Sequence, residues 1–284
     1  MAGTYTPPGE GGYSGGYQAQ GYHPQAQGGG YAPASGPGYT PVGTAPPPKD
    51  YDVEAAQAAA YLDWSDTMVR HGFIRKVYGI LSVQLGITLA TTLLFIYNAG
   101  VQDFVFSHPG MLWSAYGIML FVIICLACCG NVRRQYPTNY ILLSVFTLAT
   151  SYLVGTISAT YSTDTVLLAL VMTMGVTIGL TIYAFQTKRD FTMMGGFLFS
   201  MLFIFVIWGF LMIWYRGPIA NTLYAGAGAI IFSLYIVYDT QLIIGGKHKK
   251  YQLSPDEYVF AALNIYLDVI NLFLYILALL GNRR

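Results

Sequence analysis

Long stretches without charge dominate the pattern of hydrophobic and polar positions beyond the first quarter of the chain. Six successive runs of 22 to 29 residues contain no Asp, Glu, Lys or Arg, and a seventh contains a single acid. About 20 apolar helical residues cross a bilayer core about 30 Å thick. The pattern therefore predicts an all-α polytopic membrane protein with seven transmembrane helices, near residues 78–98, 110–130, 139–161, 165–186, 192–214, 219–244 and 258–280.

Basic residues predict the orientation of these spans. They cluster before the first span and after the second, fourth and sixth spans. Because cytoplasmic loops are enriched in Lys and Arg, we expect a cytosolic N-terminus. Seven full crossings would place Arg283 and Arg284 on the opposite side, so a last helix that is buried or re-entrant stays a second possibility.

Composition narrows the class of protein. The chain has 284 residues, of which 55% are hydrophobic and 10% are charged, with a net charge of +1. Soluble domains carry about 25% charged residues, so a soluble enzyme is disfavoured. A nucleic-acid partner is disfavoured too, because such binders have a basic surplus on one face.

The segment before the spans has two parts. Residues 1–50 are rich in Gly, Pro, Tyr and Gln and lack the aliphatic residues that build a core, which predicts a disordered cytosolic tail. Its role is either that of a solvated tail or that of a tyrosine-rich adaptor. Residues 51–77 are predicted to form an amphipathic juxtamembrane segment at the membrane surface, leaving residues 78–284 as the seven-helix domain.

Catalytic motifs are absent from the sequence. It contains no Walker loop, no H-E-x-x-H and no G-x-S-x-G, and its four histidines are scattered in the tail and loops. The three cysteines all lie in one apolar run and lack partners for a metal site. We therefore predict no catalytic residues, no metal site, no cofactor and no enzymatic activity.

Two acids inside predicted spans are the best candidates for function. Asp239 and Asp268 lie on the two helices that flank the basic loop 247–250. A charge in a span costs at least about 2.5 kcal/mol, so such residues are functional by default. A polar stripe at helical spacing surrounds Asp268, and two tyrosines lie within a turn of Asp239; these supporting residues are Asn264, Asn271, Tyr275, Tyr235 and Tyr238.

The spacing of the two acids leaves their pairing open. At 1.5 Å per residue, Asp239 lies about 9 Å before Gly245, and Asp268 lies about 21 Å beyond Ser254. They meet only if the first turns of the last helix lie outside the hydrocarbon, or if the sixth helix continues past its glycines. Otherwise they are two separate carboxyl groups. The run Ser254-Pro255-Asp256-Glu257 predicts a capping box at the start of the last helix.

Four segments carry a resemblance to a known family. They read FIRKVYGILSVQLGIT at 73–88, SYLVGTISA at 151–159, SLYIVYDTQLIIGG at 233–246 and LSPDEYVFAALNIYLDVINLFLYIL at 253–277. From about residue 60 onwards the chain resembles the Bax inhibitor or lifeguard family, and its Pro/Gly/Tyr-rich front end looks like the lifeguard branch.

The resemblance implies a seven-helix bundle with the last helix at its centre. It also implies a pH-sensitive calcium leak across endomembranes such as the endoplasmic reticulum or Golgi, with Asp239 and Asp268 as a paired proton sensor. Arg133 or Arg134 would match an arginine that contacts this pair in some relatives. Residues 110–130 lack an acid that some relatives carry in the second helix, so the resemblance does not extend to that group.

We therefore expect a calcium leak channel that moderates calcium homeostasis and stress-induced cell death, with the lipid bilayer, calcium ions and protons as its partners. The alternative is a non-conducting scaffold that inhibits apoptosis by binding receptors or cell-death proteins. A seven-helix receptor is less favoured, because the polar stripe lies at the cytosolic end.

Overall fold

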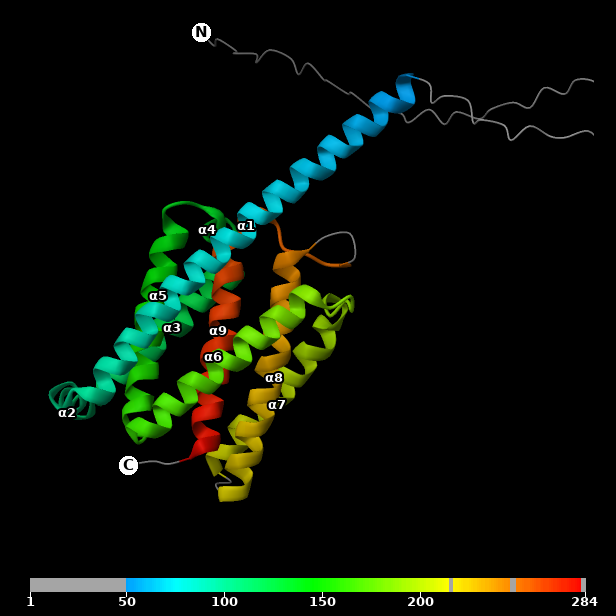
Figure 1. Ribbon diagram of the computed structural model, residues 1–284. Helices are drawn as coiled ribbons and strands as arrows, with labels where there is room; N and C mark the ends of the chain where they lie inside the picture. Colours follow the sequence, from blue (N-terminus) through cyan, green and yellow to red (C-terminus); the bar gives the residue numbers. More distant parts are fainter. Residues whose placement is uncertain (1–49, 215–216, 246–248, 282–284) are drawn as a thin grey trace, which may run out of the picture. The chain divides into compact units, whose positions relative to one another are not determined.

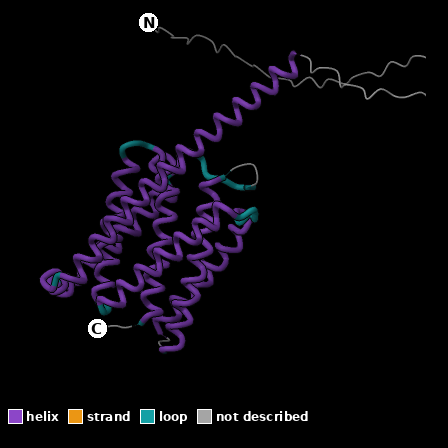
Figure 2. The backbone as a smooth tube through the Cα atoms, in the orientation of Figure 1, coloured by secondary structure: helices purple, strands orange, loops and turns teal. Residues whose placement is uncertain are grey.

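The computed structural model describes residues 50–214, 217–245 and 249–281, and the elements in these ranges are helices (Figures 1 and 2). Apart from Asp50, the predicted tail lies outside the described residues, as do Arg283 and Arg284. The elements are α1 (Asp50–Tyr97), α2 (Ala99–Ser107), α3 (Pro109–Cys128), α4 (Gly130–Arg134), α5 (Thr138–Ala159), α6 (Thr163–Gln186), the 3-10 turn η1 (Thr192–Met194), α7 (Gly195–Trp214), α8 (Pro218–Ile244), the 3-10 turn η2 (Pro255–Glu257) and α9 (Tyr258–Leu280).

Seven helical stretches are long and apolar enough to cross a membrane, which confirms the predicted all-α polytopic fold. Their large apolar side chains are exposed on the outside of the bundle, where lipid would cover them. The first stretch begins earlier than predicted because α1 runs unbroken from Asp50. The seven stretches are Asp66–Tyr97, Pro109–Cys128, Thr138–Ala159, Thr163–Gln186, Thr192–Trp214, Pro218–Ile244 and Pro255–Leu280.

Helix α9 lies at the centre of the bundle, as predicted. It packs against α1, α5, α6 and α8, and Figure 1 shows it passing between these helices. Small residues such as Ala261 and Ala262 are fully buried on it, and so is the much larger ring of Tyr266. Because α9 faces protein on most sides, it can carry polar groups that a lipid-facing helix could not.

A glycine ends α8. Gly245 has φ of +57°, a left-handed conformation that side chains rarely adopt, and its N–H still donates to the carbonyl of Gln241. A Cβ added here would lie 3.2 Å from the Arg70 guanidinium carbon. Gly245 therefore both stops the helix and lets α1 approach its end closely.

The start of α9 differs from the predicted capping box. Pro255–Glu257 form the 3-10 turn η2, and the Ser254 side chain makes no capping hydrogen bond. Glu257 is instead drawn towards the arginines of α4, as described below. A tertiary ion pair has therefore replaced the local reciprocal cap.

Candidate functional site

The two intramembrane acids meet in the structure. Asp239 on α8 and Asp268 on α9 are 6% and 5% exposed, and both side chains line the same cavity. In the part of the chain that the structure describes, Oδ2 of Asp268 is buried and has no hydrogen-bond partner. Two buried carboxyl groups therefore face one cavity from α8 and α9.

The start of α9 explains how the acids reach the same level. Helix α8 does not continue past its glycines, so the meeting depends on the first turns of α9. Glu257 accepts hydrogen bonds from Arg133 at 2.5 Å and from Arg134 at 2.8 Å. The Arg133 guanidinium also lies 4.8 Å from the ring centre of Phe260. These contacts hold the first turns of α9 at the charged end of the bundle. Asp268 comes later on the same helix and therefore lies deeper in the bundle.

The same contacts correct the expected basic partner of the acid pair. Arg133 and Arg134 were candidates to contact the pair, yet both ion pairs found among the described residues join them to Glu257. The reason is position. Both arginines lie on the short helix α4, which contacts η2 and α9 at the bundle's end. The acid pair therefore has no cationic side chain bound to it in the described part of the chain.

A cavity of about 850 Å³ opens beside the acid pair. Its wall is formed by α3, α5, α7, α8 and α9 and is largely apolar. The structure brings six of the predicted polar residues into this wall, namely Asp239, Asp268, Asn264, Asn271, Tyr235 and Tyr238. We call it the acid cavity. Polar groups from two helices thus face one internal space in an otherwise apolar bundle.

Tyr275 lies outside the acid cavity, although the helical spacing placed it on the same stripe. Its ring packs edge-on against Phe205 and Tyr224 and stacks on Phe232, with ring centres 5.4, 5.9 and 5.7 Å away. A Cβ added to Gly228 would lie 2.7 Å from the Tyr275 ring, so this glycine allows the contact. Tyr275 therefore belongs to an aromatic cluster that joins α7, α8 and α9.

Sequence reasoning missed a buried hydroxyl network on the other side of α9. The Tyr266 hydroxyl lies 2.7 Å from Oγ1 of Thr88, which in turn lies 2.9 Å from Oγ of Ser151. One turn away, the Gln84 amide donates to Thr147 at 3.0 Å. The signal was available, because Gln84 and Thr88 are one helical turn apart within an apolar run. The network fixes α1 and α5 to α9.

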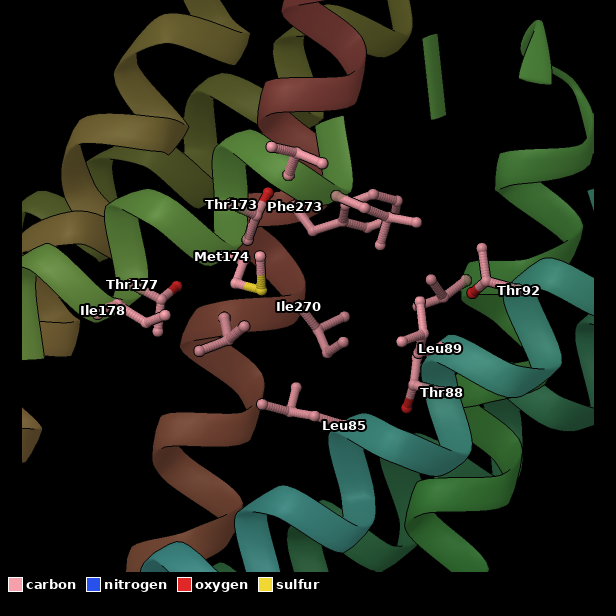
Figure 3. Close-up of a pocket in the computed structure, with 14 residues that line it drawn as sticks. Leu85, Thr88, Leu89, Thr92, Thr173, Met174, Thr177, Ile178, Ile270 and Phe273 are labelled. Atoms are coloured by element: carbon pink, nitrogen blue, oxygen red, sulfur yellow. The ribbon is translucent and has the colours of Figure 1, made fainter. Parts of the chain in front are cut away.

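A second cavity of about 410 Å³ lies between α1, α6 and α9. Figure 3 shows Leu85, Leu89, Ile270 and Phe273 around it, with threonines from α1 and α6. None of its lining residues is charged. We call it the threonine cavity. It shares two wall residues, Val154 and Ile270, with the acid cavity. The other α9 residues in the two walls differ, so the two cavities lie on different sides of α9.

Side chains suited to a metal ion are not gathered in the structure. Within residues 66–214, 217–245 and 249–281, no group of three or more His, Cys, Asp or Glu is placed to hold one. Among the described residues that line the acid cavity, Asp239 and Asp268 are the only acids.

Comparisons with known proteins agree with the fold. The family model "Inhibitor of apoptosis-promoting Bax1" matches residues 70–284. The chain is similar to protein lifeguard 3 of Homo sapiens, with 40% identity over 225 residues, which cover 78% of this chain and 72% of the relative. It is 39% identical over 226 residues to protein lifeguard 3 of Mus musculus, covering 78% and 72%. It is 38% identical over 218 residues to mouse protein lifeguard 4, covering 75% and 85%.

The family match covers six of the seven membrane-length stretches in full and most of the first, and it includes both acids, the basic residues of α4 and the start of α9. Each relative named above is more than 30% identical over more than two thirds of its own length. Together with the seven apolar helices, this shows that the chain belongs to the Bax inhibitor and lifeguard family of anti-apoptotic membrane proteins.

Proposed function

We propose that the protein is a pH-regulated calcium leak channel of endomembranes, which moderates calcium homeostasis and stress-induced cell death. One observation carries the proposal: two buried carboxyl groups, one from α8 and one from α9, lie together in the wall of a large cavity. In this proposal the protein lies in the endoplasmic reticulum or Golgi with a cytosolic N-terminus, in agreement with the positions of the basic loops.

The acid pair has the properties of a two-state proton sensor. Two carboxyl groups this close and this buried do not both ionise cheaply, so they titrate as a coupled pair. With the shared proton, a strong O–H···O⁻ bond ties α8 to α9. Without it, two negative charges repel each other or recruit a cation. Gain or loss of one proton thus shifts the population of two helix arrangements.

The acid cavity offers a route for a hard cation next to that sensor. Calcium prefers oxygen ligands from carboxylates, amide side chains and water. Asp239, Asp268, Asn264 and Asn271 supply such oxygens on one wall. Because the rest of the wall is apolar, a cation inside would be held weakly and at few points. That arrangement suits a slow leak and not a storage site.

Reconstitution separates conduction from scaffolding. Purified protein would be placed in calcium-loaded liposomes, and calcium efflux measured with an external indicator over a pH series. A leak channel accelerates efflux in a pH-dependent manner above protein-free liposomes. A scaffold that acts by binding receptors or cell-death proteins leaves efflux unchanged, and that result would reject our proposal. Subcellular fractionation of tagged protein tests the endomembrane location separately.

A further inference from the structure

A short segment before η2 contributes to the wall of the acid cavity. We call residues 249–253 the strap; they precede Ser254 and η2. Leu253 of the strap lines the acid cavity together with Leu242 of α8 and Phe260 of α9. The Leu253 N–H donates to the carbonyl of Leu242 at 3.0 Å. Three apolar side chains from α8, the strap and α9 therefore meet in the wall of the cavity that holds the acid pair.

One side of the strap is held by an arginine from α1. Nη1 of Arg70 donates to the carbonyl of Leu253 at 2.9 Å and to that of Ile243 at 3.4 Å. One guanidinium group thus joins the end of the strap to the end of α8. Gly245 makes room for it, because a Cβ at this position would crowd both the Arg70 guanidinium and Gln252 of the strap.

The other side of the strap is held by the loop between α6 and η1. The Lys250 N–H donates to Asp190 at 2.9 Å, and the Lys249 ammonium donates to the carbonyl of Arg189 at 2.8 Å. The Tyr251 N–H donates to Oγ1 of Thr192 at 3.2 Å. Three consecutive strap residues are therefore fixed to one loop.

That loop is itself locked onto α8 two residues from the acid pair. The side chain of Gln241 is fully buried; its Oε1 accepts from the Phe191 N–H at 2.8 Å, and its Nε2 donates to the Arg189 carbonyl at 3.0 Å. Gln241 lies half a helical turn beyond Asp239. A shift of α8 that separates the acids would therefore pull on the loop that holds the strap.

We propose that the strap is the gate of the acid cavity at the basic end of the bundle, held closed by Arg70, Asp190 and Gln241. This inference rests on the proposed function, since it assigns the control of access to the same acid pair. Leu253, Leu242 and Phe260 form the hydrophobic constriction, and water and cations are excluded while they remain together. Movement of α8 on loss of the shared proton releases Gln241 from the loop and frees the strap.

The proton that controls this gate belongs to the acid pair and not to the strap. Partial desolvation acts to raise the pKa of Asp190, but hydrogen bonds from Thr192 and from the Lys250 N–H, with the charge of Lys249, lower it overall. A lowered pKa means that the contribution of Asp190 is complete above its unfolded pKa and is lost only as the pH falls through the lower folded value. Asp190 therefore stays ionised at the pH values of the cytosol, and its bonds to the strap do not change there.

Thiol labelling tests the gate without relying on flux. In a background that lacks Cys125, Cys128 and Cys129, the variant Asn264→Cys places one thiol in the acid cavity. The protein would be held in lipid nanodiscs and treated with a charged thiosulfonate reagent that reaches the thiol only through water. Arg70→Met and Gln241→Leu should each raise the labelling rate at least about fivefold, the change that follows from losing one typical hydrogen bond. Arg75→Met, an exposed arginine on the same helix, is the matched control and should leave the rate unchanged.

A cross-link supplies the converse test. The variant pair Asp190→Cys and Lys250→Cys, joined by a short bifunctional thiol reagent before the cavity thiol is probed, should hold labelling at or below the rate of the parent even when Arg70→Met is present. Unchanged labelling in both Arg70→Met and Gln241→Leu would overturn the gate. So would a parent that labels as fast as an exposed cysteine. A faster labelling rate in Arg70→Met and Gln241→Leu supports the gate whether or not the liposomes show calcium efflux. Failure of the gate and failure of the leak channel are therefore distinguishable.

Discussion

The acid cavity and the threonine cavity lie on different sides of α9 and share Val154 and Ile270, yet they differ in chemistry. The acid cavity holds about 850 Å³ and is lined by two carboxyl groups, two amides and two tyrosines of the predicted set. The threonine cavity holds about 410 Å³, and hydroxyl groups are the most polar side-chain groups in its wall. Both are built from helices of similar hydropathy, so hydropathy alone would not tell them apart.

The difference lies in what each polar group is bonded to. In the threonine cavity, two of the threonine hydroxyls are bonded to the protein itself: Thr88 bonds to Tyr266 and Ser151, and Thr173 donates to the carbonyl of Ala169, whereas Oγ1 of Thr177 has no partner among the described residues. In the acid cavity, neither acid is ion-paired among the described residues, and Oδ2 of Asp268 is left without a hydrogen-bond partner there. Satisfied polar groups fix a fold, whereas a buried group with spare capacity can bind a proton or an ion. This contrast supports the proposal that the acid side of α9 carries the function.

The largest expected effect is on the acid pair. Asp239→Asn and Asp268→Asn should each reduce the pH-dependent part of the calcium leak at least about tenfold, because one carboxyl group alone no longer shares a proton. The double variant should be no worse than the worse single variant. Efflux from calcium-loaded liposomes over a pH series measures this. Near-unchanged pH profiles in both single variants would show that the acids are structural groups. The acid cavity would then not differ in function from the threonine cavity.

The next effect concerns the amides beside the acids. Asn264→Leu and Asn271→Leu should lower the leak by about threefold while the protein still folds, since each removes a polar group from a path lined by few of them. Asn264→Leu should be the stronger of the two, because the Asn271 amide already donates to the carbonyl of Leu267 at 2.8 Å. Met174→Leu, in the wall of the threonine cavity, is the matched control. Normal conduction by both variants would make the amides structural.

A smaller effect, on stability alone, is expected across α9. Tyr266→Phe removes the hydroxyl that lies 2.7 Å from Thr88, but Thr88 keeps its contacts with Ser151 and with the carbonyl of Gln84. The free energy of unfolding in detergent should fall by about 1 kcal/mol, the usual size of a polar contact between membrane helices. The pH profile of the leak should not change. A flattened profile would show that the hydroxyl network also takes part in sensing.

The spans were predictable from the sequence pattern, whereas the spacing of the two acids left their pairing open and only the family resemblance implied it. A charge-free run specifies its own helix, since the bilayer leaves the backbone no other way to satisfy its hydrogen bonds. The level of Asp268 depends instead on where α9 begins, and that is set by Glu257 meeting Arg133 and Arg134 from α4, far away in sequence. Helical spacing put Tyr275 with the asparagines, but Gly228 opens a closer aromatic site for its ring. Gln241 was missed because its partners are backbone groups of a distant loop, which no sequence pattern marks.

The smallest expected effect is a slight gain in stability in the threonine cavity. Oγ1 of Thr177 is buried and has no hydrogen-bond partner among the described residues, whereas Thr173, one turn earlier on α6, donates to the carbonyl of Ala169 at 2.7 Å. Thr177→Val replaces an unsatisfied hydroxyl with a methyl group of similar size and should raise the free energy of unfolding by about 0.5 kcal/mol. Thr173→Val, which loses a bond, should not raise it. Thermal unfolding in detergent compares the two variants, and neither should alter the leak. If Thr177→Val instead lowers stability or changes the leak, the hydroxyl has a partner inside the cavity, and both sides of α9 take part in function.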